Sequence, residues 1–359
     1  MMILLQLFPY LLLLLIVWVI SISTNIRKAS FILISLLAFF VGCRYSVGWD
    51  YWNYTSLIQN ADYGLERFEW IPRQLGFFAH EIKFPQLYFL VVGFFSMFFS
   101  IKALKRLSDD FPISIYIFLT FPLFFLTSLV IDRFFLALSI MVYCSTFLIK
   151  EKKIVPFFIG LFIAFNIHVA SLFAILFIIP CFVHVSNKVN IVFFAFSFVL
   201  NSIVIDLFIP NLSLLIGASD VFSSSAESFV KYAETGSSSG MNKIPIVFYT
   251  INVINLLCYK QLFPTNDERL NIYLSIFNIG CCLMQLFSFE QNMASRFSVF
   301  FLLYICLIVP YYKRVKNYRC IFYLLGLALY IYALTVNASH PDFVGRRNCY
   351  LPYNFFFFN

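Results

Sequence analysis

Charged residues are scarce in this sequence. Only 12% of the residues are Asp, Glu, Lys or Arg, whereas 62% are hydrophobic, and the mean hydropathy is +0.88. A water-soluble domain carries about 25% charged residues, so this composition excludes one. The chain needs lipid as its solvent, where helices satisfy their own backbone hydrogen bonds. We therefore expect an all-α, polytopic integral membrane bundle that forms a single domain over residues 1–359.

Motifs for metals and nucleotides are also missing. The nine cysteines form no C-x-x-C pair and have no histidine partner at zinc spacing. Most of them lie in apolar runs, where cysteine acts as a small buried hydrophobe, so we expect no metal site and no disulfide framework. No G-x-x-x-x-G-K-[ST] pattern occurs, which argues against ATP-driven chemistry. The sequence thus predicts no cofactor.

Long apolar runs fill most of the chain. At about 20 residues per crossing, they predict about 12 membrane segments. The first run has no basic segment before it and no small-residue cleavage site, so we interpret it as a retained span. The run over 154–183 is too long for one crossing and contains Asn166 and His168, which predicts two short helices that meet at this polar point. The runs are residues 2–22, 31–43, 85–101, 111–130, 134–149, 154–183, 189–209, 244–259, 270–288, 297–311 and 320–337.

Lysine and arginine in the short connections predict the orientation. If the segments alternate, all the basic clusters fall on one side, which is then cytoplasmic. The net charge of +8 is therefore a topology signal and requires no nucleic acid. The opposite side receives external loops 44–85 and 210–243 and an external tail, residues 338–359. The clusters are Arg27/Lys28, Lys102/Lys105/Arg106, Lys150/Lys152/Lys153, Lys188, Lys260/Arg269 and Lys313/Arg314/Lys316/Arg319.

The stretch from Arg44 to Tyr54 combines a cation, a carboxylate and three tyrosines directly after an apolar run. If the residues after Tyr51 are helical, Asp50 and Tyr54 share a face, because residues four apart are neighbours on a helix. A guanidinium at the lipid boundary can bind a phosphate, and a carboxylate can take a proton from a hydroxyl. The alternative is an Arg–Asp pair that closes a loop beside interfacial tyrosines.

Three further residues lie near the predicted outer ends of the segments. Arg133 is either a phosphate clamp or a side chain that snorkels to the headgroups beside Asp132. His168 is a proton donor or acceptor, or a structural histidine. Arg296 resembles Arg133 in its placement. Gathered arginines repel one another unless an anion joins them, so we expect an anionic, lipid-linked substrate and group transfer with a phosphate or pyrophosphate leaving group.

A set of ordered motifs resembles the EpsG/Wzy-type family of membrane polysaccharide (O-antigen) polymerases. The resemblance rests on R-Y-x-V-G-x-D-Y-x-x-Y from Arg44, on Glu69 with Pro72, on Arg133 with the residues that follow it, on H-x-x-S from His168, on Arg296 and on Pro352-Tyr353. The motifs keep the family's order over nearly the whole chain. Two positions depart from the family pattern: Trp49 replaces Thr, and Phe134 replaces Gln.

The resemblance implies a membrane glycosyltransferase of lipopolysaccharide or exopolysaccharide biosynthesis. Such an enzyme moves a growing glycan from undecaprenyl pyrophosphate onto the next lipid-linked repeat unit, at the periplasmic face of the bacterial inner (plasma) membrane. Its partners are the undecaprenyl-pyrophosphate-linked oligosaccharide, the lipid bilayer and a chain-length regulator protein. Arg44, Arg133 and Arg296 would bind the pyrophosphate, Tyr51 and Tyr54 would stack on sugars, and Asp50, Glu69 or His168 would be the base. A lipid-linked oligosaccharide flippase or transporter, an O-antigen ligase and a membrane O-acyltransferase stay open as alternatives.

Overall fold

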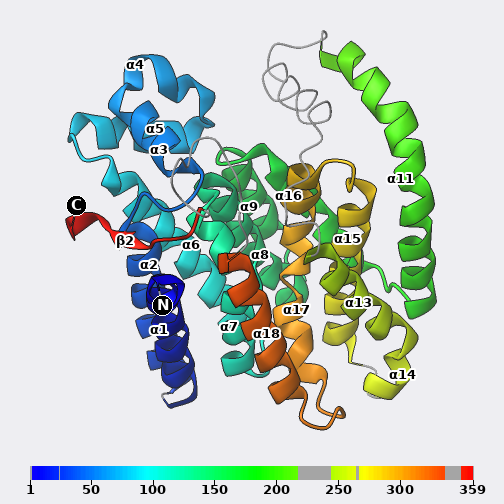
Figure 1. The fold of residues 1–359 in the computed structure, drawn as a ribbon. Helices are drawn as coiled ribbons and strands as arrows, with labels where there is room; N and C mark the ends of the chain where they lie inside the picture. The colour runs from blue at the N-terminus through cyan, green and yellow to red at the C-terminus, as the bar shows by residue number, and fades with distance from the viewer. Residues whose placement is uncertain (1, 24, 217–243, 264–266, 336–348, 359) are drawn as a thin grey trace. The chain divides into compact units, whose positions relative to one another are not determined.

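The computed structural model describes residues 2–23, 25–216, 244–263, 267–335 and 349–358. The chain divides into two compact units. The first unit comprises residues 1–182 and 305–359, and the second comprises residues 183–304. Helices form nearly all of the regular structure (Figure 1), which confirms the all-α fold class.

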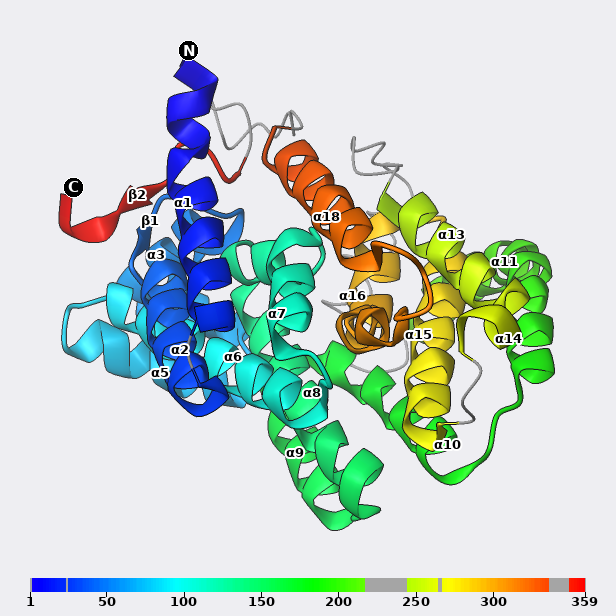
Figure 2. The same cartoon turned by 90° about the horizontal axis from the view of Figure 1, so that it is seen from below.

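The first unit is a bundle in which α2, α6, α8 and α9 pack in succession, while α1 and α18 pack on α7 (Figure 2). The elements are α1 (Met2–Ser23), α2 (Ile26–Gly42), β1 (Arg44–Tyr45), α3 (Asp50–Gln59), α4 (Ala61–Gly64), η1 (Leu65–Arg67), α5 (Trp70–Glu81), α6 (Gln86–Leu107), α7 (Phe111–Thr120), η2 (Phe125–Leu129), α8 (Asp132–Glu151), α9 (Val155–Phe165), η3 (Val169–Phe177), α10 (Ile178–Phe182), α17 (Ile305–Ile308), η4 (Val309–Tyr311), α18 (Tyr318–Thr335), β2 (Asn354–Phe355) and η6 (Phe356–Phe358).

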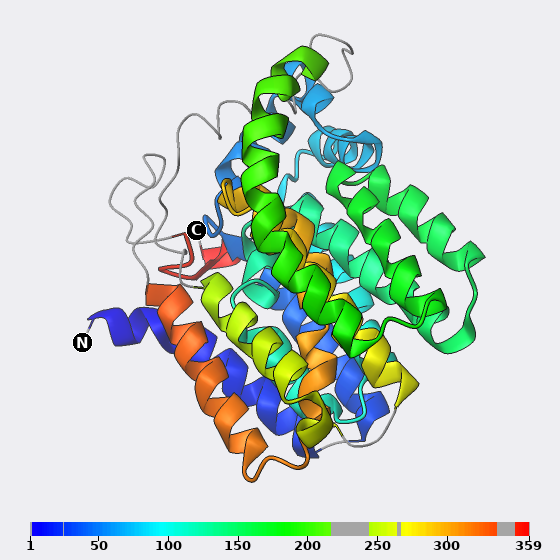
Figure 3. The same cartoon turned by 90° about the vertical axis from the view of Figure 1, so that its right-hand side faces the viewer.

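The second unit packs its helices around α15, and α11 is the long green helix of Figure 3. Buried amides join these apolar helices: Asn252 donates to Asn278 Oδ1 (2.8 Å), and Asn190 donates to Ser275 Oγ (3.1 Å). Such polar contacts hold helices together where no water competes for them. The elements are α11 (Asn187–Ile216), α13 (Ile244–Leu257), α14 (Tyr259–Leu262), α15 (Glu268–Leu286) and α16 (Gln291–Leu302).

Several helices are long and apolar enough to cross a membrane. Among the described residues these are the five helices Leu5–Ser23, Gln86–Leu107, Asp132–Glu151, Gln291–Arg314 and Tyr318–Thr335. Shorter apolar helices of 10–17 residues accompany them. Its helix lengths and composition are thus those of a multi-pass membrane protein. The count of about 12 segments and the external position of the loops stay predictions.

The segment over 154–183 folds as its sequence predicts. Helix α9 ends before Asn166, and His168 begins the 3₁₀ segment η3, so two short helices meet at the polar point. The run over 111–130 differs from the single segment expected. Helix α7 stops at Thr120, because Pro122 disfavours a helical conformation at Phe121, whose ψ is 123°.

The interval over 44–85 contains helices α3 and α5 rather than irregular loop. The predicted loop 210–243 lies outside the described residues from position 217 onward, and α11 extends through position 216. Of the predicted tail, the described residues 349–358 return to the first unit. There β2 pairs antiparallel with β1, with Phe355 opposite Arg44, and Phe356 N–H donates to Cys43 O (2.9 Å).

This returning segment, which we call the C-terminal strap (residues 349–358), fixes the turn after α2. Gly48 N–H donates to Cys349 O (2.8 Å), Tyr10 donates its hydroxyl proton to Tyr350 O (2.8 Å), and the ring of Tyr353 stacks on Phe40 at 4.1 Å. Gly48 has φ +94°, and a Cβ placed on it would lie 1.8 Å from Leu129 O. Only glycine fits this turn, both in backbone conformation and in space.

Replacing Gly48 by Ala is therefore expected to destabilise the protein by more than about 2 kcal/mol, since the methyl group meets backbone and the left-handed conformation is strained. Thermal unfolding of the detergent-purified protein, followed by size-exclusion chromatography after heating, measures the effect. The control is Asn53→Ala at an exposed position of α3. Equal melting temperatures for G48A and the wild type would contradict the close approach to Leu129.

Candidate active site

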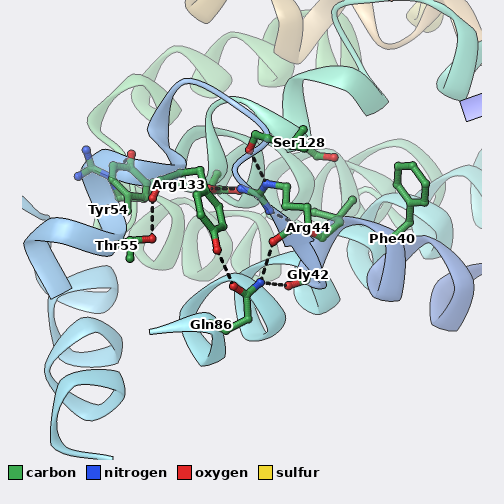
Figure 4. A network of polar contacts seen from close by, with 12 residues as sticks. Phe40, Gly42, Arg44, Tyr54, Thr55, Gln86, Ser128 and Arg133 are labelled. Atoms are coloured by element: carbon green, nitrogen blue, oxygen red, sulfur yellow. Dashed lines mark hydrogen bonds and ion pairs between the residues drawn. The ribbon is translucent and has the colours of Figure 1, made fainter. Parts of the chain in front are cut away.

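A fully buried ion pair lies where α2 ends and α8 begins (Figure 4). Arg44 is 0% exposed, and its Nη2 donates to both carboxylate oxygens of Asp132 at 2.6 Å. Its Nη1 donates to Val41 O (2.7 Å) and its Nε to Val47 O (3.1 Å). All three nitrogens are thus engaged inside the protein, so a direct contact between Arg44 and a substrate would require these bonds to break.

Gln86, the first residue of α6, secures the same turn. Its Nε2 donates to Gly42 O (2.6 Å) and to Arg44 O (3.1 Å), and Tyr51 donates its hydroxyl proton to Gln86 Oε1 (3.0 Å). The Tyr51 ring stacks on Phe89 at 4.8 Å, and the Arg44 guanidinium lies 4.9 Å from the same ring. Burial raises the pKa of Tyr51 to about 12, so the phenol keeps the proton that it donates. Tyr51 is only 4% exposed, which leaves little of its ring for stacking on a sugar.

Arg133 follows Asp132 in sequence but makes contacts of a different kind. Its Nε donates to the Tyr54 hydroxyl (2.9 Å) and its Nη1 to Glu69 Oε2 (2.5 Å), while its guanidinium carbon lies 4.3 Å from the Phe68 ring. The side chain is 18% exposed. Nη2 of Arg133 has no hydrogen-bond partner among the described residues. Arg133 is therefore an oriented cation with donor capacity left at a partly exposed position.

Helix α3 presents Tyr54 to this cation. The segment after Tyr51 is helical as predicted, so Asp50 and Tyr54 share a face of α3. Burial raises the pKa of Tyr54 well above its usual range, and the negative charge of Asp50 adds to this effect. Tyr54 therefore stays neutral and accepts the hydrogen bond from Arg133, and Asp50 is close enough to act on it electrostatically.

Glu69 stands at the position that precedes the first turn of α5. Acidic side chains at such positions commonly accept hydrogen bonds from the first helical N–H groups, but the Glu69 side chain makes no capping bond. It extends to Arg133 instead and is 26% exposed. The pair joins two segments that lie 64 residues apart in the sequence.

His168 connects α9 to η3. Its Nδ1 accepts a hydrogen bond from Ala170 N–H (3.2 Å), and its ring meets Phe134 edge to face at 5.5 Å. Since Nδ1 acts as an acceptor, the proton of the neutral ring resides on Nε2. The same junction contacts the start of α5, because Ile71 N–H donates to Asn166 O (3.1 Å).

Arg296 belongs to α16 of the second unit. Its Nε is buried without a hydrogen-bond partner in the part of the chain that the structure describes. The preceding Glu290 does not pair with it but caps α16, accepting from Asn292 N–H (3.1 Å) and Met293 N–H (2.5 Å). Arg296 thus has unused donor capacity, as Arg133 does.

The first unit brings together most of the predicted site residues, namely Arg44, Asp50, Tyr51, Tyr54, Glu69, Arg133 and His168. Sequence reasoning did not predict Gln86 or Phe68 as parts of the site, and it named Asp132 only as a neighbour of Arg133. None of the three carries a local signal for these roles. Within the described ranges, no group of three or more His, Cys, Asp or Glu side chains is arranged to hold a metal ion.

Comparison with known proteins identifies one family. The model of the EpsG family matches residues 28–355, which covers nearly the whole chain and includes every residue of the site. No curated protein and no solved structure matches the chain.

Removal of one partner of the buried pair should be costly. We expect Asp132→Ala to destabilise the protein by about 3–5 kcal/mol, because a desolvated guanidinium is left without its counter-ion. The double variant Arg44→Met/Asp132→Leu should recover a large part of this loss, since it leaves no buried charge. Thermal unfolding of the three proteins in one detergent checks this. A double variant less stable than Asp132→Ala would show that the pair does not act as a unit.

Proposed function

We propose, since the chain belongs to the EpsG family, that it joins lipid-linked glycan units into a polysaccharide at a site built around Arg133. The family supports a polysaccharide-polymerase function of the glycosyltransferase kind in a multi-pass membrane protein. The donor that we propose is a glycan on undecaprenyl pyrophosphate, the acceptor is the next lipid-linked repeat unit, and the reaction takes place at the periplasmic face of the bacterial inner membrane.

The geometry of Arg133 carries this proposal. A guanidinium fixed by Tyr54 and backed by the Phe68 ring, with Nη2 available, can donate a hydrogen bond to a phosphate oxygen. Asp132–Glu151 is long and apolar enough to span a membrane and begins beside this residue, so Arg133 stands at the end of a span. In a bilayer that this helix crosses, the headgroup of a membrane-anchored pyrophosphate would lie at an end of the span.

The basic clusters support the side of the membrane that we propose. Lys105 donates to Ser30 near the start of α2 (2.9 Å), and Arg106 pairs with Glu151 at the end of α8. Both contacts lie at the ends of α2, α6 and α8 opposite to Arg44, Gln86 and Asp132. If this basic end faces the cytoplasm, as the excess of positive charge in short loops favours, the site faces the periplasm.

The reaction transfers one glycosyl group. The acceptor hydroxyl oxygen forms a bond to the anomeric carbon of the donor, and the bond from this carbon to the pyrophosphate oxygen breaks. The electron pair of the broken bond stays on the pyrophosphate, where Arg133 stabilises the developing charge. The hydroxyl proton passes to a protein base and then to water. The donor carries its own leaving group, so no nucleotide takes part.

Glu69 suits the role of the base better than His168 does. The Nδ1 lone pair of His168 is occupied by Ala170 N–H, and Nε2 bears the proton, so the neutral ring offers a donor rather than a basic nitrogen. Glu69 is a partly exposed carboxylate directly beside the proposed anion site. We therefore assign proton acceptance to Glu69 and hydrogen-bond donation to His168, and we place Asp50 behind Tyr54 as an electrostatic support.

The binding roles depend on whether a side chain uses its hydrogen-bond donors within the protein or has donors left for the substrate. Arg133 has a donor to offer the substrate, so it stays in the proposed pyrophosphate site. The role of Arg296, which also has an unused donor, stays a prediction from the sequence. Arg44 holds the frame of the site, because its donors are used within the protein. Tyr54 positions Arg133, and Tyr51 positions Gln86.

We expect Arg133→Ala to abolish polymer in cells that depend on this chain, while single exported repeat units persist, because the leaving group loses its main cation. A loss of about 100-fold or more in polymer would match the removal of one stabilising donor group at a transition state. A ladder gel of surface polysaccharide measures it, and membrane levels of the variant are compared by blotting. The matched control is Arg67→Ala, which removes the same side chain at an exposed position of η1.

The same gel separates the competing functions. Loss of every exported unit in a deletion strain indicates a flippase, and polymer of full length that is not attached to its acceptor indicates a ligase. Full-length polymer in cells that carry Arg133→Ala would contradict the site that we propose.

His168→Asn tests the tautomer argument. An Asn side-chain oxygen can accept the hydrogen bond from Ala170 N–H and preserve the start of η3, but it cannot reproduce the Nε2 donor. We expect normal membrane levels and thermal stability with polymer lowered by about 10-fold or more, as expected for a lost donor worth ~1.5 kcal/mol. Unchanged polymer in His168→Asn would show that this histidine only caps η3.

A further inference from the structure

We propose that Arg133 is a switch between two anions: it holds Glu69 in the empty site and releases it when a pyrophosphate-bearing substrate binds. This inference rests on the proposed function and adds a regulation to the same site. Its physical basis is that Glu69 and a bound pyrophosphate compete for one guanidinium.

The first step is the occupancy of Arg133. Nε is committed to Tyr54, which is 3% exposed and fixed between the rings of Phe68 (4.9 Å) and Tyr88 (5.8 Å). Nη1 is committed to Glu69. An anion that engages Nη2 alone would make a single contact. An anion that binds through two parallel N–H groups needs Nη1 as well, and Glu69 occupies it.

The second step is the ease of exchange. Both partners are partly exposed, at 18% for Arg133 and 26% for Glu69, so their separation uncovers no dry charge. The free energy of a partly exposed ion pair is smaller than that of a fully buried one, so a second anion can replace the carboxylate. A pyrophosphate carries more negative charge than a carboxylate and binds guanidinium in the same planar manner. The pair Arg44–Asp132 is the internal contrast, because there both side chains are buried and no exchange is available.

The third step is where Glu69 goes. It occupies the position before the first turn of α5 without capping that helix. Once released, its carboxylate can meet the acceptor hydroxyl. No capping bond competes for it, because Ile71 N–H donates to Asn166 O and Pro72 has no N–H. While Glu69 Oε2 is bonded to Arg133, this oxygen is engaged and is not available to the acceptor hydroxyl.

The consequence is an ordered reaction. The proton of the acceptor hydroxyl moves to Glu69 only after the donor pyrophosphate has taken Arg133. The new glycosidic bond then forms, and the bond between the anomeric carbon and the pyrophosphate oxygen breaks. The electron pair stays on the pyrophosphate oxygen, whose charge Arg133 stabilises. With no donor bound, the carboxylate stays paired with Arg133.

The test is a binding experiment on the full-length protein in lipid nanodiscs. The probe is farnesyl pyrophosphate, with inorganic pyrophosphate and farnesol as separate arms. If Glu69 competes for Arg133, Glu69→Gln binds farnesyl pyrophosphate about two- to fivefold more tightly than the wild type, which is the factor expected from an ion pair of this exposure. The same variant makes no polymer in cells.

Glu66→Gln is the matched control, because it removes the same charge from the same segment at an exposed residue that has no ion pair with Arg133. Its affinity should equal that of the wild type, which separates competition from a general gain in positive charge. In Arg133→Gln, a second substitution at Glu69 should no longer tighten binding. If inorganic pyrophosphate gives the same pattern, the anion is the competitor of Glu69. If only farnesyl pyrophosphate gives it, the lipid tail also contributes to recognition. Both outcomes support the switch.

Equal or weaker binding by Glu69→Gln overturns the switch, as does tightening of the same size in Glu66→Gln or binding of farnesol as strong as that of the pyrophosphate. Failure of the proposed function gives another result: the wild type then binds neither pyrophosphate probe. Comparison of melting temperatures confirms that each variant is folded before its affinity is interpreted.

Discussion

The ion pair between Arg44 and Asp132 is the constraint on which the rest of the site depends. Transfer of two charges out of water costs several kcal/mol per ion, and this cost is offset only where the geometry satisfies nearly every donor. The structure meets this condition with the carboxylate of Asp132, two backbone carbonyls and the face of Phe89. The turn after α2, the start of α6 and the start of α8 are therefore tied to one another. A shift of the turn after α2 or of the start of α8 would leave a buried charge unpaired, and a shift of α6 would break the bonds from Gln86 to two backbone carbonyls.

Asp132 and Arg133 show how a helix start can serve two purposes. Successive residues on a helix point about 100° apart, so neighbours face different surroundings. Asp132 is 2% exposed and serves the frame, whereas Arg133 is turned toward Tyr54 and Glu69. Arg133, the cation that is available for chemistry, is thus positioned by the neighbouring Asp132, which is not available for chemistry. Arg44 and Arg133 have the same side chain, and burial alone gives them opposite roles.

The sequence predicts those features that depend on neighbouring residues. Two features follow from the local pattern, and both are confirmed. They are the helix that places Asp50 and Tyr54 on one face and the break at Asn166 and His168. The early end of α7 also has a local cause in Pro122, although the hydrophobic run suggested one segment. The fold class follows from composition alone.

Pairings across the chain could not be predicted in this way. Arg44 pairs with Asp132 at a sequence separation of 88 residues, and Arg133 pairs with Glu69 at a separation of 64. Many other carboxylates in the sequence were equally available as partners. Gln86 looks like an ordinary polar residue before a span, and only the packing of α2 against α6 gives it two backbone carbonyls. Charge and residue type indicated the chemistry of the site, whereas packing decided which cation is exposed.

The C-terminal strap has a consequence for biosynthesis. Its backbone bonds to Cys43 and Gly48 join segments that leave the ribosome about 300 residues apart, and at about 5–20 residues per second the earlier segment waits for tens of seconds. During that interval the turn that carries Arg44 has neither its strand partner nor the aromatic ring that stacks on Phe40. The nascent protein inserts its early helices into the membrane with this turn unfinished, and the turn is completed only after residues 349–358 have been made.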